Sequence, residues 1–325
     1  MKPEDRVINQ PTMLNRPEQK KRIGSLKKNT VLDPLEEVET YFLKKMKKYK
    51  TENSYDVNAQ ELPKFKTLNY TEYGTNFLIC PLNLELRLRQ IEHAWRDTDD
   101  VKILDYKEFF IKNINKQVAN KYQNRSQEFE KYPDVDNLVI LPGSNKLKEH
   151  ICLNKLKKIA FDHEGDIYFK PHPVTTHAII GELKDMFGEL AILPREIDLY
   201  HFLPNVSKVY TTHMSESALY AAVLGKEIEP IEVYQTTHRG SFYHINRFLF
   251  ENQVYEADTG EWVNKTFSSP KSGIFNPRID SNWKNKLDQY LSYIHDERER
   301  FSDWYVEGKP GGVKKRVDGR LLKDK

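Results

Sequence analysis

Cysteine is scarce in this sequence, and the two that occur, Cys80 and Cys152, stand far apart. Two isolated cysteines provide neither the paired spacing of a zinc site nor the framework of a disulfide-stabilised domain. We therefore expect a protein of a reducing, cytoplasmic compartment.

Long apolar runs are also absent. No stretch approaches the roughly 18 to 20 consecutive apolar residues that a membrane-spanning helix requires. The first residues are rich in Lys, Asn and Gln and lack the apolar centre of a signal peptide. Mean hydropathy is −0.74 and 30% of the residues are charged. The sequence therefore predicts a large polar surface and no transmembrane segment.

Familiar catalytic signatures are missing too. The chain contains no Gly-x-Gly-x-x-Gly motif, no P-loop and no His-Glu-x-x-His motif. Residues 97–99 and 134–136 match an Asp-x-Asp metal-binding pattern. Two acids that flank one residue arise often by chance, so no metal site is predicted.

Positive and negative charges nearly balance, at 51 Lys and Arg against 48 Asp and Glu, but they are unevenly distributed. Residues 1–50 hold 13 basic against 7 acidic residues, and residues 307–325 hold 7 against 3. The ends therefore carry about +10 together and the middle about −7. Basic ends suit an anionic partner such as nucleic acid, polysaccharide or a lipid surface, and they equally suit solvated tails.

A short β-rich segment at 167–169 ends at Lys170-Pro171-His172-Pro173. Proline restricts its own backbone and that of the residue before it, so we expect His172 on a rigid loop at a strand end. In an open α/β sheet, loops at the carboxyl ends of the strands bind ligands.

A second β-rich segment, at 209–212, leads into a polar turn that contains Ser215 and Ser217. A helix is predicted over 218–224, closed by Gly225. Such a turn offers backbone N–H groups, hydroxyls and the positive end of a helix dipole to an anion.

The other segments alternate between helical and β-rich patterns, which is typical of an α/β fold. In the first half we predict helices at 34–49, 84–96 and 108–131, strands at 76–80 and 101–106, and a linker at 133–137. In the second half we predict strands at 138–141, 167–169, 190–193, 209–212 and 228–233, with helices at 147–162, 177–187, 196–203 and 283–304.

The expected organisation has five parts. They are a flexible basic N-terminus (1–32), an N-terminal, acceptor-side α/β domain (33–135), a C-terminal, nucleotide-sugar-binding α/β domain (136–280), a closing helix (281–306) and a basic tail (307–325).

The Lys-Pro-His-Pro turn, followed later by a strand, a small polar turn and Ala-Leu-Tyr-Ala-Ala-Val-Leu-Gly-Lys, resembles glycosyltransferases with two Rossmann-like domains facing a cleft (the GT-B fold). The chain is most similar to the bacterial capsular-polysaccharide, polysialyltransferase and sialyltransferase group, whose hallmarks are a His-Pro motif and a Ser-rich motif. The likeness covers about residues 138–232. The chain departs from the group in its Ser-Glu-Ser form of the second motif and in lacking an acidic-acidic-Gly motif in its N-terminal half.

The resemblance implies a nucleotide-sugar donor, UDP- or CMP-linked, held by the C-terminal domain, and no required cofactor. Sugar transfer builds negative charge on the leaving phosphate, which hydrogen-bond donors stabilise. His172 can supply a proton or charge there. Asp105, at a predicted strand end in the first domain, is a candidate general base.

The candidate donor-binding residues lie in the loops that follow the predicted strands of the second domain. They are Gly143, Ser144, Lys146, Lys170, Pro173, His213, Ser215, Glu216 and Ser217. His238, Arg239 and Ser241 stand in a polar loop that can reach donor or acceptor. Each has a plain structural alternative, such as a turn histidine, an ordinary helix cap or a surface side chain.

The acceptor is not fixed by the sequence. The resemblance favours a surface polysaccharide or glycolipid. The basic ends also suit a phage-type DNA glycosyltransferase that acts on hydroxymethylated bases. Transfer of a polyol phosphate, in enzymes with a similar His-Pro turn, is a further alternative. A non-catalytic nucleic-acid-binding protein on an α/β scaffold is the alternative from a different class.

Overall fold

The computed structural model describes residues 37–38, 40–42, 44–45, 68–73, 76–81, 84–114, 134–143, 147, 151–195, 197–236, 242–255 and 258–302 of the 325-residue chain. The chain divides into two compact units, and segments of the two units alternate along the sequence. Unit 1 comprises residues 1–36, 72–76 and 105–264, and unit 2 comprises residues 37–71, 77–104 and 265–325.

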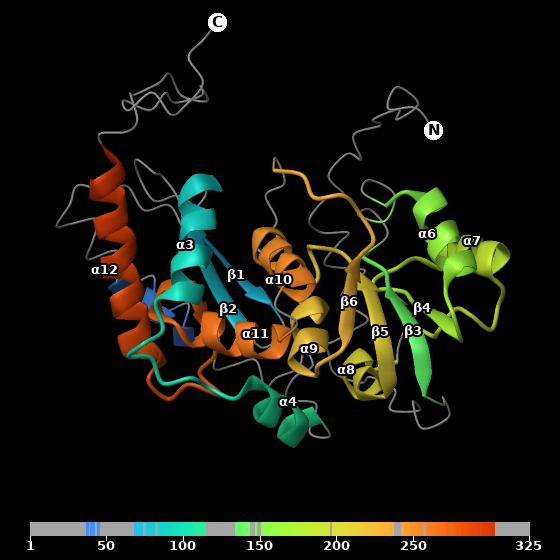
Figure 1. The fold of residues 1–325 in the computed structure, drawn as a ribbon, viewed down its shortest axis with the longest axis horizontal. Helices are drawn as coiled ribbons and strands as arrows, with labels where there is room; N and C mark the ends of the chain where they lie inside the picture. The colour runs from blue at the N-terminus through green and yellow to red at the C-terminus, as the bar shows by residue number, and fades with distance from the viewer. Residues whose placement is uncertain are drawn as a thin grey trace, which may run out of the picture. The chain divides into compact units, whose positions relative to one another are not determined.

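The centre of unit 1 is a parallel four-stranded sheet in the order β4-β3-β5-β6, whose strands lie side by side in Figure 1. The strands are β3 (Val135–Ile140), β4 (Ile167–Lys170), β5 (Val206–Thr211) and β6 (Glu227–Pro230). Ile192 forms a parallel bridge with Phe169 and so extends the sheet beyond β4. The prediction of an α/β fold with parallel strands is confirmed at this level.

The register of the sheet fixes where its strands end. Ile140 pairs with Lys170, Val139 with Tyr210, and Thr211 with Pro230. Lys170, Ile140, Thr211 and Pro230 therefore stand level across the sheet, and we call them the terminal rung. The loops that follow the terminal rung start together at the carboxyl edge of the sheet.

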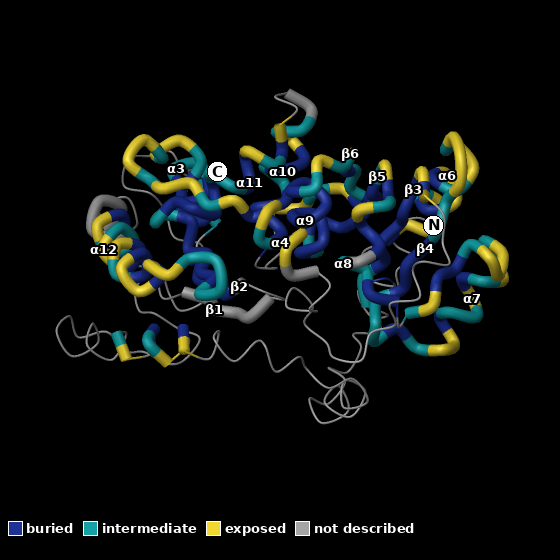
Figure 2. Tube along the Cα trace, turned by 90° about the horizontal axis from the view of Figure 1, so that it is seen from below, coloured by how far each residue is buried: buried dark blue, intermediate teal, exposed yellow. Residues whose placement is uncertain are grey.

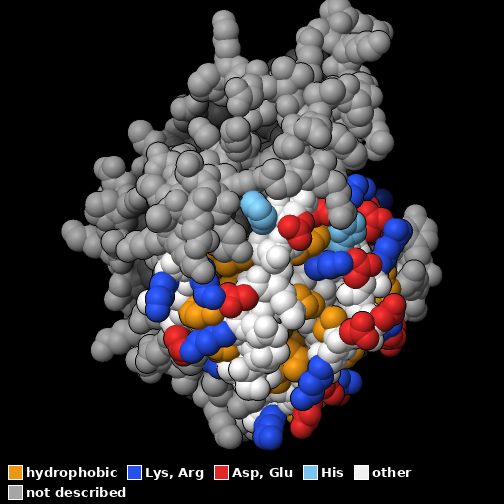
Figure 3. Space-filling view, turned by 90° about the vertical axis from the view of Figure 1, so that its left-hand side faces the viewer, with side chains coloured by type: hydrophobic (Ala, Val, Ile, Leu, Met, Phe, Trp, Pro, Cys, Tyr) orange, Lys and Arg blue, Asp and Glu red, His pale blue; other side chains and the backbone are white. Residues whose placement is uncertain are grey.

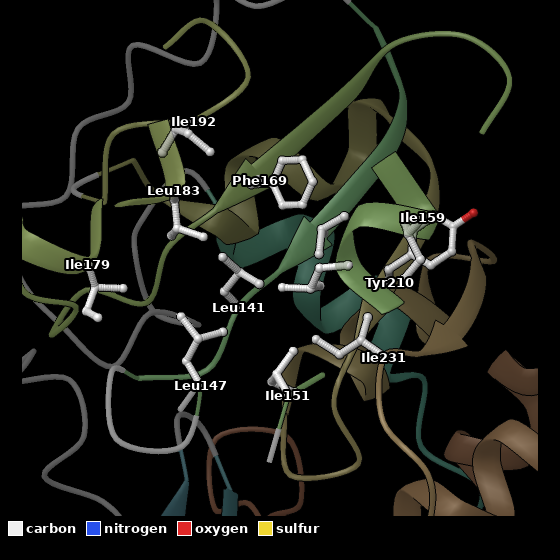
Figure 4. Close-up of a cluster of buried hydrophobic side chains, with 12 residues drawn as sticks. Leu141, Leu147, Ile151, Ile159, Phe169, Ile179, Leu183, Ile192, Tyr210 and Ile231 are labelled. Carbon is white, nitrogen blue, oxygen red and sulfur yellow. The ribbon is translucent and has the colours of Figure 1, made fainter. Parts of the chain in front are cut away.

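One face of the sheet is covered by helices α6 (Leu153–Asp162) and α7 (His177–Phe187). Side chains alternate between faces along a strand, so the paired residues Val139, Phe169 and Tyr210 point to the same side. They join a buried apolar cluster (Figure 4), in which the aliphatic side chains surround Phe169. The Phe169 ring stacks on Phe187 with centroids 4.3 Å apart.

Further helices complete unit 1: α4 (Tyr106–Ile114), α8 (Leu199–Phe202), the 3-10 helix η4 (Leu203–Asn205), α9 (Ser217–Val223) and α10 (Tyr243–Tyr255). Three aromatic rings link α4, α8 and α9. Phe110 lies 5.8 Å from Tyr200 and 5.0 Å from Tyr220 between ring centroids. Figure 2 shows β3 as largely buried and the outer turns of α6 and α7 as exposed.

Unit 2 carries most of a three-stranded sheet in the order β1-β2-β7. Its elements are β1 (Leu68–Tyr73), β2 (Asn76–Pro81), α3 (Leu84–Arg96), the 3-10 helix η5 (Pro270–Ser272), β7 (Ile274–Phe275) and α12 (Trp283–Ser302). Helix α11 (Thr259–Ser268) crosses from unit 1 into unit 2. Tyr290 on α12 donates to the carbonyl of Ile79 at 3.0 Å.

Several predicted elements are confirmed, including the helices at 84–96 and 177–187. The strand predicted at 101–106 is wrong. Residues 101–105 form no strand, and Asp105 instead caps α4 by accepting from the backbone N–H of Glu108 at 2.7 Å. The linker predicted at 133–137 is wrong from Val135 onward, because β3 begins there.

The helix predicted at 147–162 is interrupted. Leu147 is helical, residues 151 and 152 are not, and α6 then covers Leu153–Asp162. Helices α10 and α11 were not predicted. The predicted helix at 108–131 extends past the end of α4 into residues outside the described ranges.

Candidate functional site

The carboxyl edge of the parallel sheet brings together residues from four strands. Each strand is followed, two positions beyond the terminal rung, by a residue of this edge. These residues are His172 after β4, Pro142 after β3, His213 after β5 and Glu232 after β6. Neighbouring strands lie about 4.8 Å apart. The chain therefore presents two histidines on either side of the end of β3.

His172 lies in a tight turn after β4. The backbone N–H of Thr175 donates to the His172 carbonyl at 2.8 Å, and the N–H of Val174 donates to His172 Nδ1 at 3.2 Å. Because Nδ1 is the acceptor of this bond, the neutral imidazole carries its proton on Nε2. Nε2–H is then the ring's donor group.

Two cations hold the backbone of this turn. The buried ammonium of Lys170 donates to the carbonyls of Pro171 and Arg195, both at 2.9 Å. Arg195 in turn donates through Nη1 to the carbonyl of Thr175 at 2.8 Å. Lys170, a candidate donor-binding residue, therefore fixes the position of the His172 turn through main-chain oxygens.

Gly143 lies beside the same turn. A Cβ atom at this position would stand 3.4 Å from Val174 Cγ2 and 3.9 Å from His172 Nδ1. The structure thus brings Gly143 close to the predicted Pro-His-Pro turn, in which Pro173 is half-buried. Ser144 and Lys146 lie outside the described residues.

The polar turn after β5 caps the helix that follows it. Ser215 Oγ accepts from the backbone N–H of Ser217, the first residue of α9, at 3.2 Å. Glu216 Oε1 accepts from the Tyr220 hydroxyl at 3.4 Å within the buried start of α9. The chain's own hydroxyl and carboxylate therefore occupy the surroundings of this helix N-terminus.

His213, in the same turn, is almost entirely buried, with 4% of its surface exposed. Glu232 Oε1 accepts from the His213 backbone N–H at 2.7 Å and lies 3.0 Å from Nδ1. A carboxylate is only an acceptor, so Nδ1 carries the ring proton. Glu232 Oε2 is buried without a hydrogen-bond partner among the described residues.

Helix α10 supports this pair. Asn246 Nδ2 donates to the carbonyls of His213 at 2.6 Å and Ser215 at 2.8 Å. Three aromatic rings surround the His213 imidazole with centroids at 4.9 to 5.6 Å: Phe250, Tyr243 and Tyr234. The ring is therefore held by both hydrogen bonds and packing.

Tyr234 and Tyr243 stack on each other at 5.3 Å, and the Tyr234 hydroxyl lies 2.6 Å from His244 Nδ1. Burial raises the pKa of Tyr243, so its hydroxyl stays protonated near neutral pH. Sequence reasoning missed Glu232 and Asn246. An acid near the end of the strand predicted at 228–233 was the available signal for Glu232.

The remaining candidates lie elsewhere or are not described. Asp105 caps α4 and lines a shallow surface hollow of about 460 Å³ with Lys107, Glu108, Ile111 and Lys112. His177, at the start of α7, is exposed, and its Nε2 lies 3.2 Å from Arg195 Nη2. His238, Arg239 and Ser241 lie outside the described residues.

The described residues include no group of three or more His, Cys, Asp and Glu placed to hold a metal ion. None of their helices has the length and apolar character to span a membrane. No family model matches the chain, and the comparisons with curated proteins and with solved structures found no significant match.

Proposed function

We propose that the chain is a glycosyltransferase that binds a nucleotide sugar at the carboxyl edge of the β4-β3-β5-β6 sheet. The observation that carries this proposal is the close approach of Gly143 to the His172 turn, at the ends of two adjacent parallel strands. With the bridge at Ile192, the strands run in the order 3-2-1-4-5 by position in the chain. This order reverses between β3 and β5, and nucleotides bind at such a point in doubly wound sheets.

The chemistry of sugar transfer fits this edge. A nucleotide sugar leaves as a phosphate that gains negative charge when the bond to the anomeric carbon breaks. A rigidly held donor that points at this charge lowers the barrier. His172 supplies Nε2–H, and Lys170 and Arg195 keep its turn in place through three carbonyl contacts.

The proposal extends to a Rossmann-like nucleotide domain in unit 1, with the second unit on the acceptor side of a GT-B arrangement. We prefer a polysaccharide or glycolipid acceptor to DNA. On the face seen in Figure 3, cationic and acidic side chains are interspersed. Several described cations of unit 2 pair with acids, among them Lys45 with Asp288 and Lys284 with Glu37. A duplex-binding surface requires cations free for phosphates.

The proposal is tested by nucleotide release. The purified full-length chain is incubated with UDP-, CMP-, CDP- and GDP-linked sugars and with a CDP-linked polyol. Anionic glycans or hydroxymethylcytosine-containing DNA are added as acceptors. Turnover of one sugar donor, accelerated by a glycan, is the expected result. Turnover of the CDP-polyol alone would assign polyol-phosphate transfer, and acceleration by DNA would assign the DNA acceptor.

Two substitutions at His172 separate its roles. His172→Asn places an amide oxygen near the Nδ1 position, where it can accept from Val174 N–H, but it removes Nε2–H. We expect it to lower kcat by 100-fold or more, in the range of about 10² to 10⁴ for a lost proton donor. His172→Gln offers an amide N–H nearer the Nε2 position and should retain more activity. His163→Ala, at the end of α6, is the matched control. Equal activity of all three would contradict the proposal.

A further inference from the structure

Two histidines at the carboxyl edge have opposite hydrogen-bonding states. His172 accepts at Nδ1 from Val174 and so presents Nε2 as a donor. His213 donates at Nδ1 to Glu232 and so presents Nε2 as an acceptor in the neutral ring. A neutral imidazole with its proton on Nε2 can donate there, and one with its proton on Nδ1 can accept at Nε2, so the two rings offer a donor and an acceptor to one reaction.

The register places the strand ends that precede these histidines level with each other. Each stands two residues beyond the terminal rung, and only β3 lies between their strands. Two strand spacings of about 4.8 Å put the strand ends roughly 10 Å apart. Inverting glycoside hydrolases hold acid and base about 6.5 to 9.5 Å apart, which leaves room for the nucleophile between them.

Two buried acceptor atoms beside His213 have no hydrogen-bond donor among the described residues. Glu232 Oε2 and Asn246 Oδ1 are buried without partners among the described residues. Within the same part of the chain, His213 Nε2 has no hydrogen-bond partner. Buried acceptors left without donors are rare in folded proteins and indicate a missing partner. A ligand hydroxyl is the kind of group that supplies a donor there.

We propose that His213 is a second catalytic residue, which accepts the proton of the acceptor hydroxyl, and that Glu232 is the residue that positions it. This inference rests on the proposed function and names the base for the same site. The acceptor O–H proton passes to His213 Nε2 while the oxygen bonds to the anomeric carbon. The bond from that carbon to the phosphate oxygen breaks, and His172 Nε2–H stabilises the leaving phosphate.

Glu232 acts through His213 in two ways. Its Oε1 atom binds both the backbone N–H and Nδ1, so it fixes the ring orientation and the position of the proton. Its negative charge stabilises the imidazolium that forms when Nε2 takes a proton. The other titratable groups facing the ring are Tyr234 and Tyr243, together with Glu232 from the loop after β6.

The decisive variant is His213→Asn, assayed as the full-length chain with the donor that wild type turns over. The Asn amide N–H reproduces the Nδ1 donor to Glu232 but provides no Nε2. We expect kcat to fall by about 100-fold or more, with unchanged affinity for the free nucleotide. Tm should fall, because the smaller side chain leaves a cavity among the three aromatic rings. The limb of the kcat–pH profile that falls toward acid pH should disappear.

Glu232→Gln keeps an acceptor oxygen for His213 and removes the charge. It should lower kcat by about tenfold and shift the same limb toward lower pH, because the imidazolium loses the negative charge that stabilises it. A purely structural pair would instead change nucleotide affinity and leave the pH profile in place.

A measurement on wild type does not depend on variants that fold. Acid and base on opposite sides of the anomeric carbon act in one displacement, so the product should have inverted anomeric configuration, read by NMR. Retention would overturn the inference, as would a His213→Asn enzyme within threefold of wild-type kcat, or one that loses nucleotide affinity together with kcat. Failure of wild type to release nucleotide from any donor would instead overturn the proposed function.

Discussion

A buried lysine in unit 2 gives a stability prediction that changes sign with pH. Lys286 on α12 is 5% exposed, and its ammonium donates to the carbonyl of Phe267. Burial lowers its pKa to about 7, although Asp280 acts in the opposite direction. In an unfolded chain the pKa of lysine is about 10.4.

The magnitude follows from linkage. Below pH 7 the folded state holds a buried charge, and the pKa difference corresponds to a penalty of about 5 kcal/mol. Between pH 7 and about 10.4 the unfolded state binds more protons than the folded state, so the penalty is relieved as pH rises. Lys286→Met removes this penalty but leaves the Phe267 carbonyl without its donor, which costs about 1 to 3 kcal/mol.

We therefore expect Lys286→Met to stabilise unit 2 by about 2 to 4 kcal/mol at pH 6 and to destabilise it by about 1 to 3 kcal/mol near pH 10. Urea unfolding at pH 6, 8 and 10, followed by hydrogen exchange in α12, measures this. Lys284→Met on the same helix is the control, since its side chain is 52% exposed and pairs with Glu37. A difference between wild type and Lys286→Met that stays constant across pH would refute the reasoning.

Three further outcomes are expected. Gly273→Ala should abolish folding of unit 2 at 37 °C, because φ is +67° and the new Cβ would meet the Ile79 carbonyl at 2.0 Å; circular dichroism measures it. Asp105→Ala should cost about 1 kcal/mol through loss of the Glu108 cap, without loss of nucleotide affinity. Asn246→Leu should cost about 1 to 3 kcal/mol in urea melts, since two buried carbonyls lose their donor.

The parts of the fold that follow from local pattern were predictable. Helices at 84–96 and 177–187 have clear apolar faces, and the strand before Pro171 ends where proline requires it. The segment at 101–106 has the composition of a strand, but Asp105 is a better helix cap than a strand residue. Helix α10 mixes aromatic, charged and polar residues without a clear period, and it takes its place by packing on β6 and α9.

In the candidate site, too, one part was predictable from local sequence pattern and another part was not. His172 could be found because its turn is local, made by prolines on either side and closed within four residues. The His213–Glu232 pair depends on the register between β5 and β6, which brings together residues 19 apart in the chain. No local pattern specifies that register, since it is set by the burial of Val209 and Ile228 in the assembled sheet.

The most direct test of the account is hydrogen–deuterium exchange of the whole chain with and without UDP or CMP. The nucleotide that serves as leaving group should slow exchange at the carboxyl edge, in residues 141–143, 171–176 and 211–217. Residues 163–166, at the opposite edge of the sheet, should be unaffected. Protection confined to other segments, or no protection by any nucleotide, would contradict the claim that this edge binds a nucleotide sugar.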